Sequence, residues 1–128
     1  METANRPAIT LDLKKRRIRI HNTTLHALND PPYIELLVNP DKLTLAVRAS
    51  KQKYRLAHKM YYDTRDNELY SDTLLKQLCR VCSGMEYRGS YRINGIHYPD
   101  QSLVIFEMQK MILINETLAK EFTNECNQ

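Results

Sequence analysis

The sequence predicts an α+β domain, in which two strand–helix–hairpin units surround one small mixed or antiparallel sheet or barrel and a C-terminal helix follows. Three observations predict it: apolar residues alternate with polar ones in several short segments, other segments show helical spacing, and Pro-Asp turns separate runs of strand formers. The 128 residues suffice for one hydrophobic core. We expect a single domain over 1–128, with units at 9–48 and 54–108 and a terminal helix at 115–125.

The first unit begins with an interrupted strand. Apolar residues alternate with polar ones over 9–13 and 18–20, on either side of a basic run at 14–17. Asn22 and Thr23 are favoured helix N-cap residues, and the short apolar face that follows must end before Pro31. We therefore expect a helix of about two turns.

A β-hairpin completes this unit. Residues 33–38 and 43–47 are rich in strand formers. The turn at 39–42 contains a proline, which presets the backbone, and Asn and Asp residues, which close turns by hydrogen bonding. These features predict two antiparallel strands joined by a short turn.

The second unit repeats this plan less regularly. Alternation over 54–62 predicts a strand and 63–67 a polar turn, after which Ser71 or Asp72 caps a longer helix that ends at Gly84. The apolar face of this helix includes leucines, valine and cysteines at helical spacing. We expect it to pack on the core.

The second hairpin has strands at 91–98 and 103–108 around a Pro-Asp-Gln turn, while Asn94-Gly95 offers a competing turn. Its Pro-Asp turn lies 59 residues after the first one, whereas the Leu-x-x-Leu pairs of the two helices are 50 residues apart. A duplication with an insertion between the second helix and its hairpin would explain both offsets. The alternative is that two short matches arose by chance.

Composition restricts the class of protein. With 42% hydrophobic and 27% charged residues the chain is ordinary for a globular protein, and no stretch approaches the roughly 20 apolar residues of a membrane helix. The N-terminus lacks the apolar core of a secretory signal, and three cysteines fit reduced thiols. We expect a cytoplasmic protein. A net charge of +4 permits nucleic acid or an acidic protein surface as partner.

Two basic segments supply the candidate binding residues. In the second segment Tyr54 lies among cations, and such an aromatic ring can stack on an unpaired base, so single-stranded DNA or RNA is as eligible as a duplex. The structural alternatives are a solvated strand edge for the first segment and core or rim packing for the tyrosine. The candidate nucleic-acid-binding residues are Lys14, Lys15, Arg16, Arg17, Arg19, Arg48, Lys51, Lys53, Arg55 and Lys59.

Motifs for catalysis or metal binding are weak. Cys79-x-x-Cys82 has the spacing of a zinc or redox pair, but it lies in a predicted helix among core-like residues, so we expect buried structural thiols. His21 and His26 are out of phase for one helical face, and no motif places a nucleophile or paired carboxylate beside a histidine. We predict no enzymatic activity, no metal and no cofactor.

The segment Arg17-Ile18-Arg19-Ile20, with the short helix ending at Ala27-Leu28 and the hairpin of 33–48, resembles the AbrB-type swapped-hairpin unit. The resemblance covers about 16–48, with a degenerate second copy at about 54–108. Two units in one chain resemble the MraZ branch, in which tandem units build a pseudo-twofold domain.

This resemblance implies DNA binding by arginines of the first strand and the adjoining loops. Those arginines correspond to Arg17 and Arg19, supported by the cations at 14–16. Swapped hairpins complete each other's sheets, so it also implies a homodimer. In two positions the chain departs from the family, with His21 in place of the usual proline and Leu25 in place of a helix arginine.

The whole chain also resembles small proteins from mobile elements of gut Firmicutes, which share its Arg-Ile-Arg-Ile-His, Thr-Leu-His, Tyr-Ile and Asn-Pro elements. That resemblance implies no particular activity. Two hypotheses therefore stand: nucleic-acid binding in the manner of AbrB- and MraZ-type regulators, and inhibition by a mobile-element protein, such as an anti-CRISPR, that binds a bacterial nuclease effector or its guide RNA.

Overall fold

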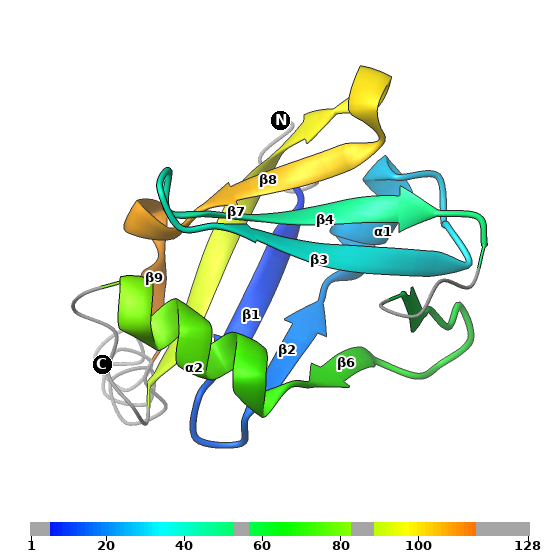
Figure 1. Cartoon of the computed structure of the whole chain (residues 1–128). Coiled ribbons are helices and arrows are strands. Elements are labelled where there is room, and N and C mark those ends of the chain that lie inside the picture. The colour runs from blue at the N-terminus through cyan, green and yellow to red at the C-terminus, as the bar shows by residue number, and fades with distance from the viewer. Residues whose placement is uncertain (1–5, 53–56, 83–88, 115–128) are drawn as a thin grey trace, which may run out of the picture.

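The computed structural model describes residues 6–52, 57–82 and 89–114 (Figure 1). The described strands are β1 (Ala8–Asp12), β2 (Arg17–Ile20), β3 (Tyr33–Asn39), β4 (Thr44–Ser50), β5 (His58–Lys59), β6 (Asn67–Tyr70), β7 (Ser90–Tyr98), β8 (Leu103–Glu107) and β9 (Ile112–Ile114). The described helices are α1 (Asn22–Ala27) and α2 (Asp72–Val81), with short 3-10 turns η2 (Pro99–Gln101) and η3 (Met108–Lys110).

The strands build a nearly closed antiparallel β-barrel. Neighbours follow the order β5-β3-β4-β8-β7-β1-β2-β6, and β9 pairs with β7. The predicted α+β class is wrong, because the described residues are mostly β and only α2 among them exceeds two helical turns. The short strands β6 and β9 lie outside every alternating pattern, so the sequence predicts too little sheet. The terminal helix predicted at 115–125 lies outside the described residues.

With nine residues, β7 is the longest described strand, and it joins the two halves of the barrel. Its residues 90–94 pair with β1, whereas 95–98 pair with β8. The competing turn at Asn94-Gly95 therefore does not form. Gly95 lies where β7 changes neighbours, and a Cβ there would lie 2.6 Å from the Phe106 ring. The glycine is needed for close strand packing rather than for a turn.

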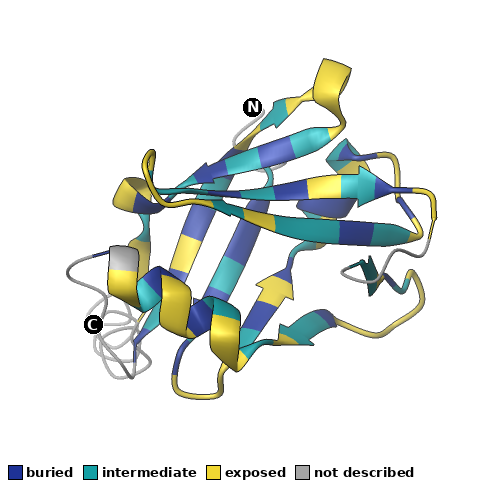
Figure 2. Ribbon diagram, in the orientation of Figure 1, coloured by how far each residue is buried: buried dark blue, intermediate teal, exposed yellow. Residues whose placement is uncertain are grey.

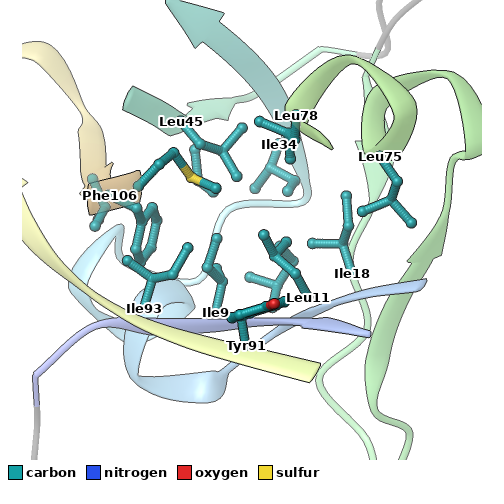
Figure 3. Close-up of a cluster of buried hydrophobic side chains, with 14 of the residues drawn as sticks. Ile9, Leu11, Ile18, Ile34, Leu45, Leu75, Leu78, Tyr91, Ile93 and Phe106 are labelled. Carbon is teal, nitrogen blue, oxygen red and sulfur yellow. The ribbon is translucent and has the colours of Figure 1, made fainter. Parts of the chain in front are cut away.

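The core fills the barrel, and α2 covers its open side (Figures 1 and 2). Alternate strand residues point inward, as Ile9 and Leu11 do from β1, and α2 adds Leu75 and Leu78. Figure 3 shows these side chains converging with others from the surrounding strands. Each fully buried side chain of this size contributes about 1.5–3 kcal/mol relative to exposure. This burial anchors the β1–β2 hairpin on the barrel.

Both helices begin near the predicted positions. Ser71 is the N-cap of α2, as predicted, and its hydroxyl accepts a first-turn backbone N–H. At α1, however, His21 rather than Asn22 occupies the N-cap position, because the extended backbone of β2 continues through it. The buried Thr24 hydroxyl donates to the Ala8 carbonyl at 2.7 Å and accepts from the N–H of that residue at 2.9 Å. These two bonds fasten α1 to β1.

The strand order has an internal twofold correspondence. The elements β1-β2-α1-β3-β4 can be matched in order with β5-β6-α2-β7-β8. Under this matching the pair β3·β4 corresponds to β7·β8, and the pair β1·β7 corresponds to β5·β3. The pairs β2·β6 and β4·β8 each correspond to themselves. The predicted plan of the second unit needs one correction. Its strand before the helix is β6, and of the strand predicted at 54–62 only β5 is present in the described residues.

The two hairpins share one register and one turn geometry. Asn39 pairs with Thr44, and 59 residues further along the chain Tyr98 pairs with Leu103. The residue before each second strand, Leu43 in the first hairpin and its counterpart in the second, has a φ of 52°. A left-handed backbone is uncommon outside glycine, so the shared conformation shows that the two predicted Pro-Asp turns are built alike.

A seam without a backbone ladder lies between β5 and β6, at the ends of the described sheet order. The buried Asn67 bridges it. Its Oδ1 accepts from the Tyr61 N–H at 2.7 Å, and its Nδ2 donates to the Tyr61 carbonyl at 2.8 Å. Two bonds in opposite directions are what ladder partners exchange. The Asn67 amide therefore ties the start of β6 to the segment that follows β5, and the barrel remains nearly closed.

Candidate nucleic-acid interface

The β1–β2 hairpin presents the first basic segment at one end of the barrel. The single interrupted strand predicted over 9–20 is wrong, because its two halves are antiparallel partners and the basic run is the turn between them. Lys14, Lys15 and Arg16 form its turn, and all three are exposed. The Asp12 side chain accepts from the Lys15 N–H at 3.1 Å, and Arg16 has a φ of 56°, so backbone geometry holds the turn. In the part of the chain that the structure describes, Lys14 and Lys15 make no ion pair.

Arg17 and Arg19 lie on the outer face of β2. Because Ile18 and Ile20 are buried in the core, the arginines between them point away from it. The Arg17 side chain is 29% exposed and the Arg19 side chain is 47% exposed. The structure therefore brings all five predicted cations of the first segment onto one hairpin.

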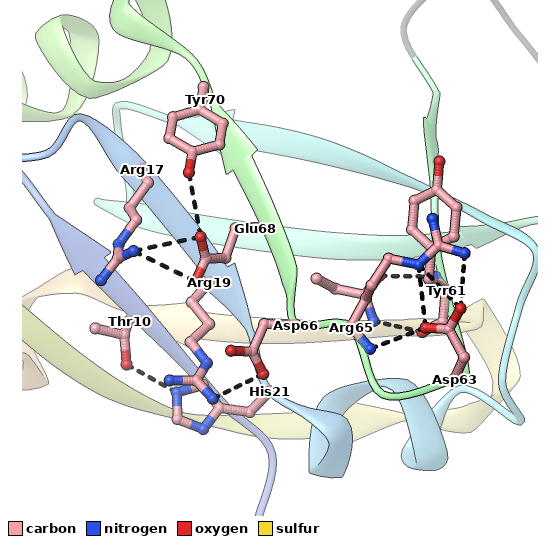
Figure 4. A network of polar contacts seen from close by, with 11 residues as sticks. Thr10, Arg17, Arg19, His21, Tyr61, Asp63, Arg65, Asp66, Glu68 and Tyr70 are labelled. Atoms are coloured by element: carbon pink, nitrogen blue, oxygen red, sulfur yellow. Dashed lines mark hydrogen bonds and ion pairs between the residues drawn. The ribbon is translucent and has the colours of Figure 1, made fainter.

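Each arginine of this hairpin faces a carboxylate from a distant part of the chain. The pairs are Arg16 with Asp72 at 3.3 Å, Arg17 with Glu68 at 3.3 Å and Arg19 with Asp66 at 3.0 Å, and Figure 4 shows the last two. Arg17 also lies 3.5 Å from Asp12. The pairs of Arg16 and Arg19 are exposed and contribute about 0–1 kcal/mol, so a phosphate can replace these two carboxylates at small cost. The pairs of Arg17 are partly buried, so this arginine is held more firmly by its own carboxylates.

The second basic segment lies elsewhere on the barrel. Arg48 is on β4, which β8, β7 and β1 separate from β2, and it pairs with Glu35 at 3.3 Å. Lys51 is exposed just after β4, and Lys59 lies 5.6 Å from the centroid of the Tyr61 ring. The structure does not bring these cations to the hairpin. Outside the described residues lie Lys53, Tyr54 and Arg55.

A further cation joins the outer face of the hairpin. Arg92 of β7 is opposite Thr10 of β1, which in turn is opposite Arg19 of β2. Arg92 is exposed, and its neighbours Tyr91 and Ile93 are buried. Alternation along β7 could have shown that this side chain points outward, but the pairing of β7 with β1 had no signal in the sequence.

The β5–β6 loop carries a cation–aromatic cluster that sequence reasoning also missed (Figure 4). The Arg65 guanidinium lies 4.2 Å from the centroid of the Tyr61 ring and 2.6 Å from Asp63. The hydrogen bonds from Arg65 hold the pKa of the Asp63 carboxyl below its usual value. The loop leads into Asn67 of β6, which is opposite Ile20 of β2, so it lies at the end of this strand pair remote from the β1–β2 turn.

His21 follows β2 and lies beside these arginines. Its Nε2 is 2.7 Å from the Thr10 hydroxyl. Burial lowers the pKa of its imidazole, and the charges of Arg92 and Arg19 lower it further, while Asp66 acts in the opposite direction. His21 therefore supplies a neutral hydrogen-bonding group to this face near pH 7.

Cys79 and Cys82 are free thiols on α2 and at its C-terminal end. Cys82 is buried, as predicted, whereas Cys79 is half-buried. Burial raises the pKa of both thiols, which keeps them protonated at neutral pH. Over the described ranges, no three His, Cys, Asp or Glu side chains are grouped so that they could hold a metal ion.

In comparisons with known proteins, no family model, curated protein or solved structure matches this chain. A search of the described helices finds none that is long and apolar enough to span a membrane.

Proposed function

We propose that this protein is a non-enzymatic binding protein that contacts the phosphates of nucleic acid through the β1–β2 hairpin. The observation that carries the proposal is that the cations at 14–17 and Arg19 all project from one hairpin away from the core. Arg92 extends this surface onto β7. Neutralising several phosphates releases counterions, so the affinity should fall steeply with salt.

The resemblance to AbrB-type proteins supports the same hairpin as the DNA contact. It implies DNA binding by the arginines of β2 and the adjoining loops. The twofold correspondence of the strand order also supports it, since tandem units of the MraZ branch build a pseudo-twofold domain. Twofold binding elements match the half-sites of a palindromic duplex, and a homodimer would extend that match. We therefore favour duplex DNA as the ligand and the cytoplasm as the location.

The β5–β6 loop is the counterpart of the β1–β2 turn in this correspondence. The registers of β1 with β7 and of β5 with β3 place Ile9 and His58 at equivalent positions, 49 residues apart. The same offset relates Arg16 to Arg65. We include Arg65 and Lys59 as second contacts with the same duplex, on the other side of the twofold relation.

Exposed apolar side chains support a second candidate, a protein-binding inhibitor. Tyr70 is 71% exposed opposite Arg17, and Ile112 is 57% exposed opposite Arg92. Aromatic and arginine side chains are enriched in protein interfaces. A complex with a purified bacterial nuclease effector that persists at high salt and without nucleic acid would favour this candidate.

The test replaces Arg16, Arg17 and Arg19 together by alanine. The affinity for a short fluorescent DNA duplex, measured by anisotropy, is expected to fall at least about tenfold, and the slope of log affinity against log salt is expected to fall by about 3. Single-stranded DNA and RNA of the same length serve as competitors, and stronger binding to either would replace duplex DNA as the ligand.

The matched control combines Lys42→Glu with Lys110→Ala, which removes the same three units of positive charge at exposed positions outside the hairpin. This variant should retain most of the affinity. The proposal is wrong if the hairpin variant binds as the wild type does at low salt, or if the control loses as much. Thermal melting of each variant verifies that it is folded.

A further inference from the structure

A cleft lies between α2 and the turn of the β1–β2 hairpin. Its volume is about 330 Å³, within the lower range of small-molecule sites. Leu13 and Leu75, which are 6% and 4% exposed, provide apolar lining, together with the half-buried Cys79. One part of the cleft therefore suits an apolar group.

The remaining lining of the cleft is mostly cationic. Arg16, Lys76 and Arg80 contribute three positive charges, and Asp72 contributes the single carboxylate. Asp72 already pairs with Arg16 at 3.3 Å and with Lys76 at 3.7 Å. Arg80 is exposed and makes no ion pair with any residue that the structure describes. The cleft thus has an excess of positive charge beside its apolar lining, and Arg80 is available for an anion.

We propose that this cleft binds a small amphipathic carboxylic acid, with the carboxylate on Arg80 and Arg16 and the hydrocarbon tail against Leu13 and Leu75. A guanidinium can bind a carboxylate through two parallel hydrogen bonds, which favours this head group over a neutral one. The tail removes apolar surface from water, which a purely ionic ligand cannot do. This proposal does not depend on the nucleic-acid proposal, although Arg16 takes part in both.

The experiment titrates the full-length protein with octanoate by isothermal titration calorimetry. Saturable binding of octanoate is expected, while acetate, which lacks the tail, and octylammonium, which reverses the charge, are expected to bind at least about tenfold more weakly. Equal binding of octanoate and octylammonium, or no octanoate binding, would overturn the proposal.

Two variants locate the site. Arg80→Glu should weaken octanoate binding at least about tenfold, whereas Lys42→Glu, the same charge change at an exposed position of the first hairpin turn, should leave it unchanged. Cys79→Phe should block the cleft. Equal effects of the two charge reversals, or full binding by the cysteine variant, would contradict the assignment.

Alkylation supplies a readout that does not depend on folding of a variant. Octanoate should slow the reaction of the Cys79 thiol with N-ethylmaleimide, followed by peptide mass spectrometry, because the tail would cover that side chain. Acetate at the same concentration should give no protection. If octanoate also leaves the Cys79 rate unchanged, the ligand does not occupy this cleft.

Discussion

At the scale of single residues, the hairpin arginines have two kinds of partner, internal carboxylates and the phosphates of the proposed ligand. Alternation alone predicts that Arg17 and Arg19 point outward. Their carboxylate partners were invisible in the sequence, because Glu68 lies 51 residues and Asp66 lies 47 residues away along the chain. These carboxylates neutralise the arginines in the free protein and compete with any phosphate.

This competition leads to a prediction for Asp66→Asn. Loss of the carboxylate beside Arg19 should increase the affinity for duplex DNA about two- to fivefold at low salt, since an exposed ion pair contributes about 0–1 kcal/mol. Anisotropy with the same fluorescent duplex measures the effect. The gain should shrink as salt screens the charges.

Asp41→Asn is the matched control, because it removes the same charge from the exposed turn of the first hairpin. It reports the effect of net charge alone. If both variants gain equally, the pairing of Arg19 with Asp66 does not limit binding and Arg19 is not at the interface.

At the scale of elements, turn chemistry predicts the hairpins well. Pro40 and Pro99 mark both turns, and the structure builds them with the same register. The sequence is a poor guide where a strand is short or changes neighbours. β6 has only four residues, and the Asn94-Gly95 pair, a favourable turn sequence, lies inside β7 because both halves of that strand find buried partners.

The position of Gly95 leads to a prediction for Gly95→Ala. The added methyl group would lie 2.6 Å from side-chain atoms of Phe106 and Val104, both fully buried, so strands β7 and β8 would have to shift. We expect a loss of about 1–3 kcal/mol in the free energy of unfolding, measured with urea.

Asn94→Ala on the same strand is the control, since it introduces no side-chain atom beyond the β-carbon already present. It should cost clearly less than the glycine substitution. If the Gly95→Ala protein were as stable as the wild type, β8 would not pack closely against this position.

At the scale of the whole molecule, the barrel is nearly closed, and a side chain spans the gap in its ladder. β5 and β6 are joined through Asn67 and the backbone of Tyr61, instead of through a ladder. This link is close to the hairpin arginines, because Arg19 and Asn67 lie on the paired strands β2 and β6. If the seam opened, β6 would be held along one edge only, by its ladder with β2.

Asn67→Ala tests this closure. The substitution removes two hydrogen bonds and leaves the Tyr61 N–H and carbonyl without their partner, so we expect a loss of about 2–4 kcal/mol in the free energy of unfolding. Asn39→Ala is the control, because its side chain accepts two backbone N–H groups in an exposed turn and should cost only about 0.5–1 kcal/mol. Equal losses would show that the seam does not hold the barrel together.

By itself the sequence determined the local features of this protein. These are the alternating segments 9–13 and 18–20, the capped helix α2, the two Pro-Asp turns and the outward direction of Arg17 and Arg19. These follow from periodicity and turn chemistry, which act over a few residues. Only the tertiary structure decided the barrel, the carboxylate partners of the arginines, the seam at Asn67 and the cleft beside α2. The barrel, the arginine partners and the cleft join residues that lie dozens of positions apart, whereas the Asn67–Tyr61 bonds span only six residues. All of them depend on which faces the whole chain buries and which backbone groups it must pair.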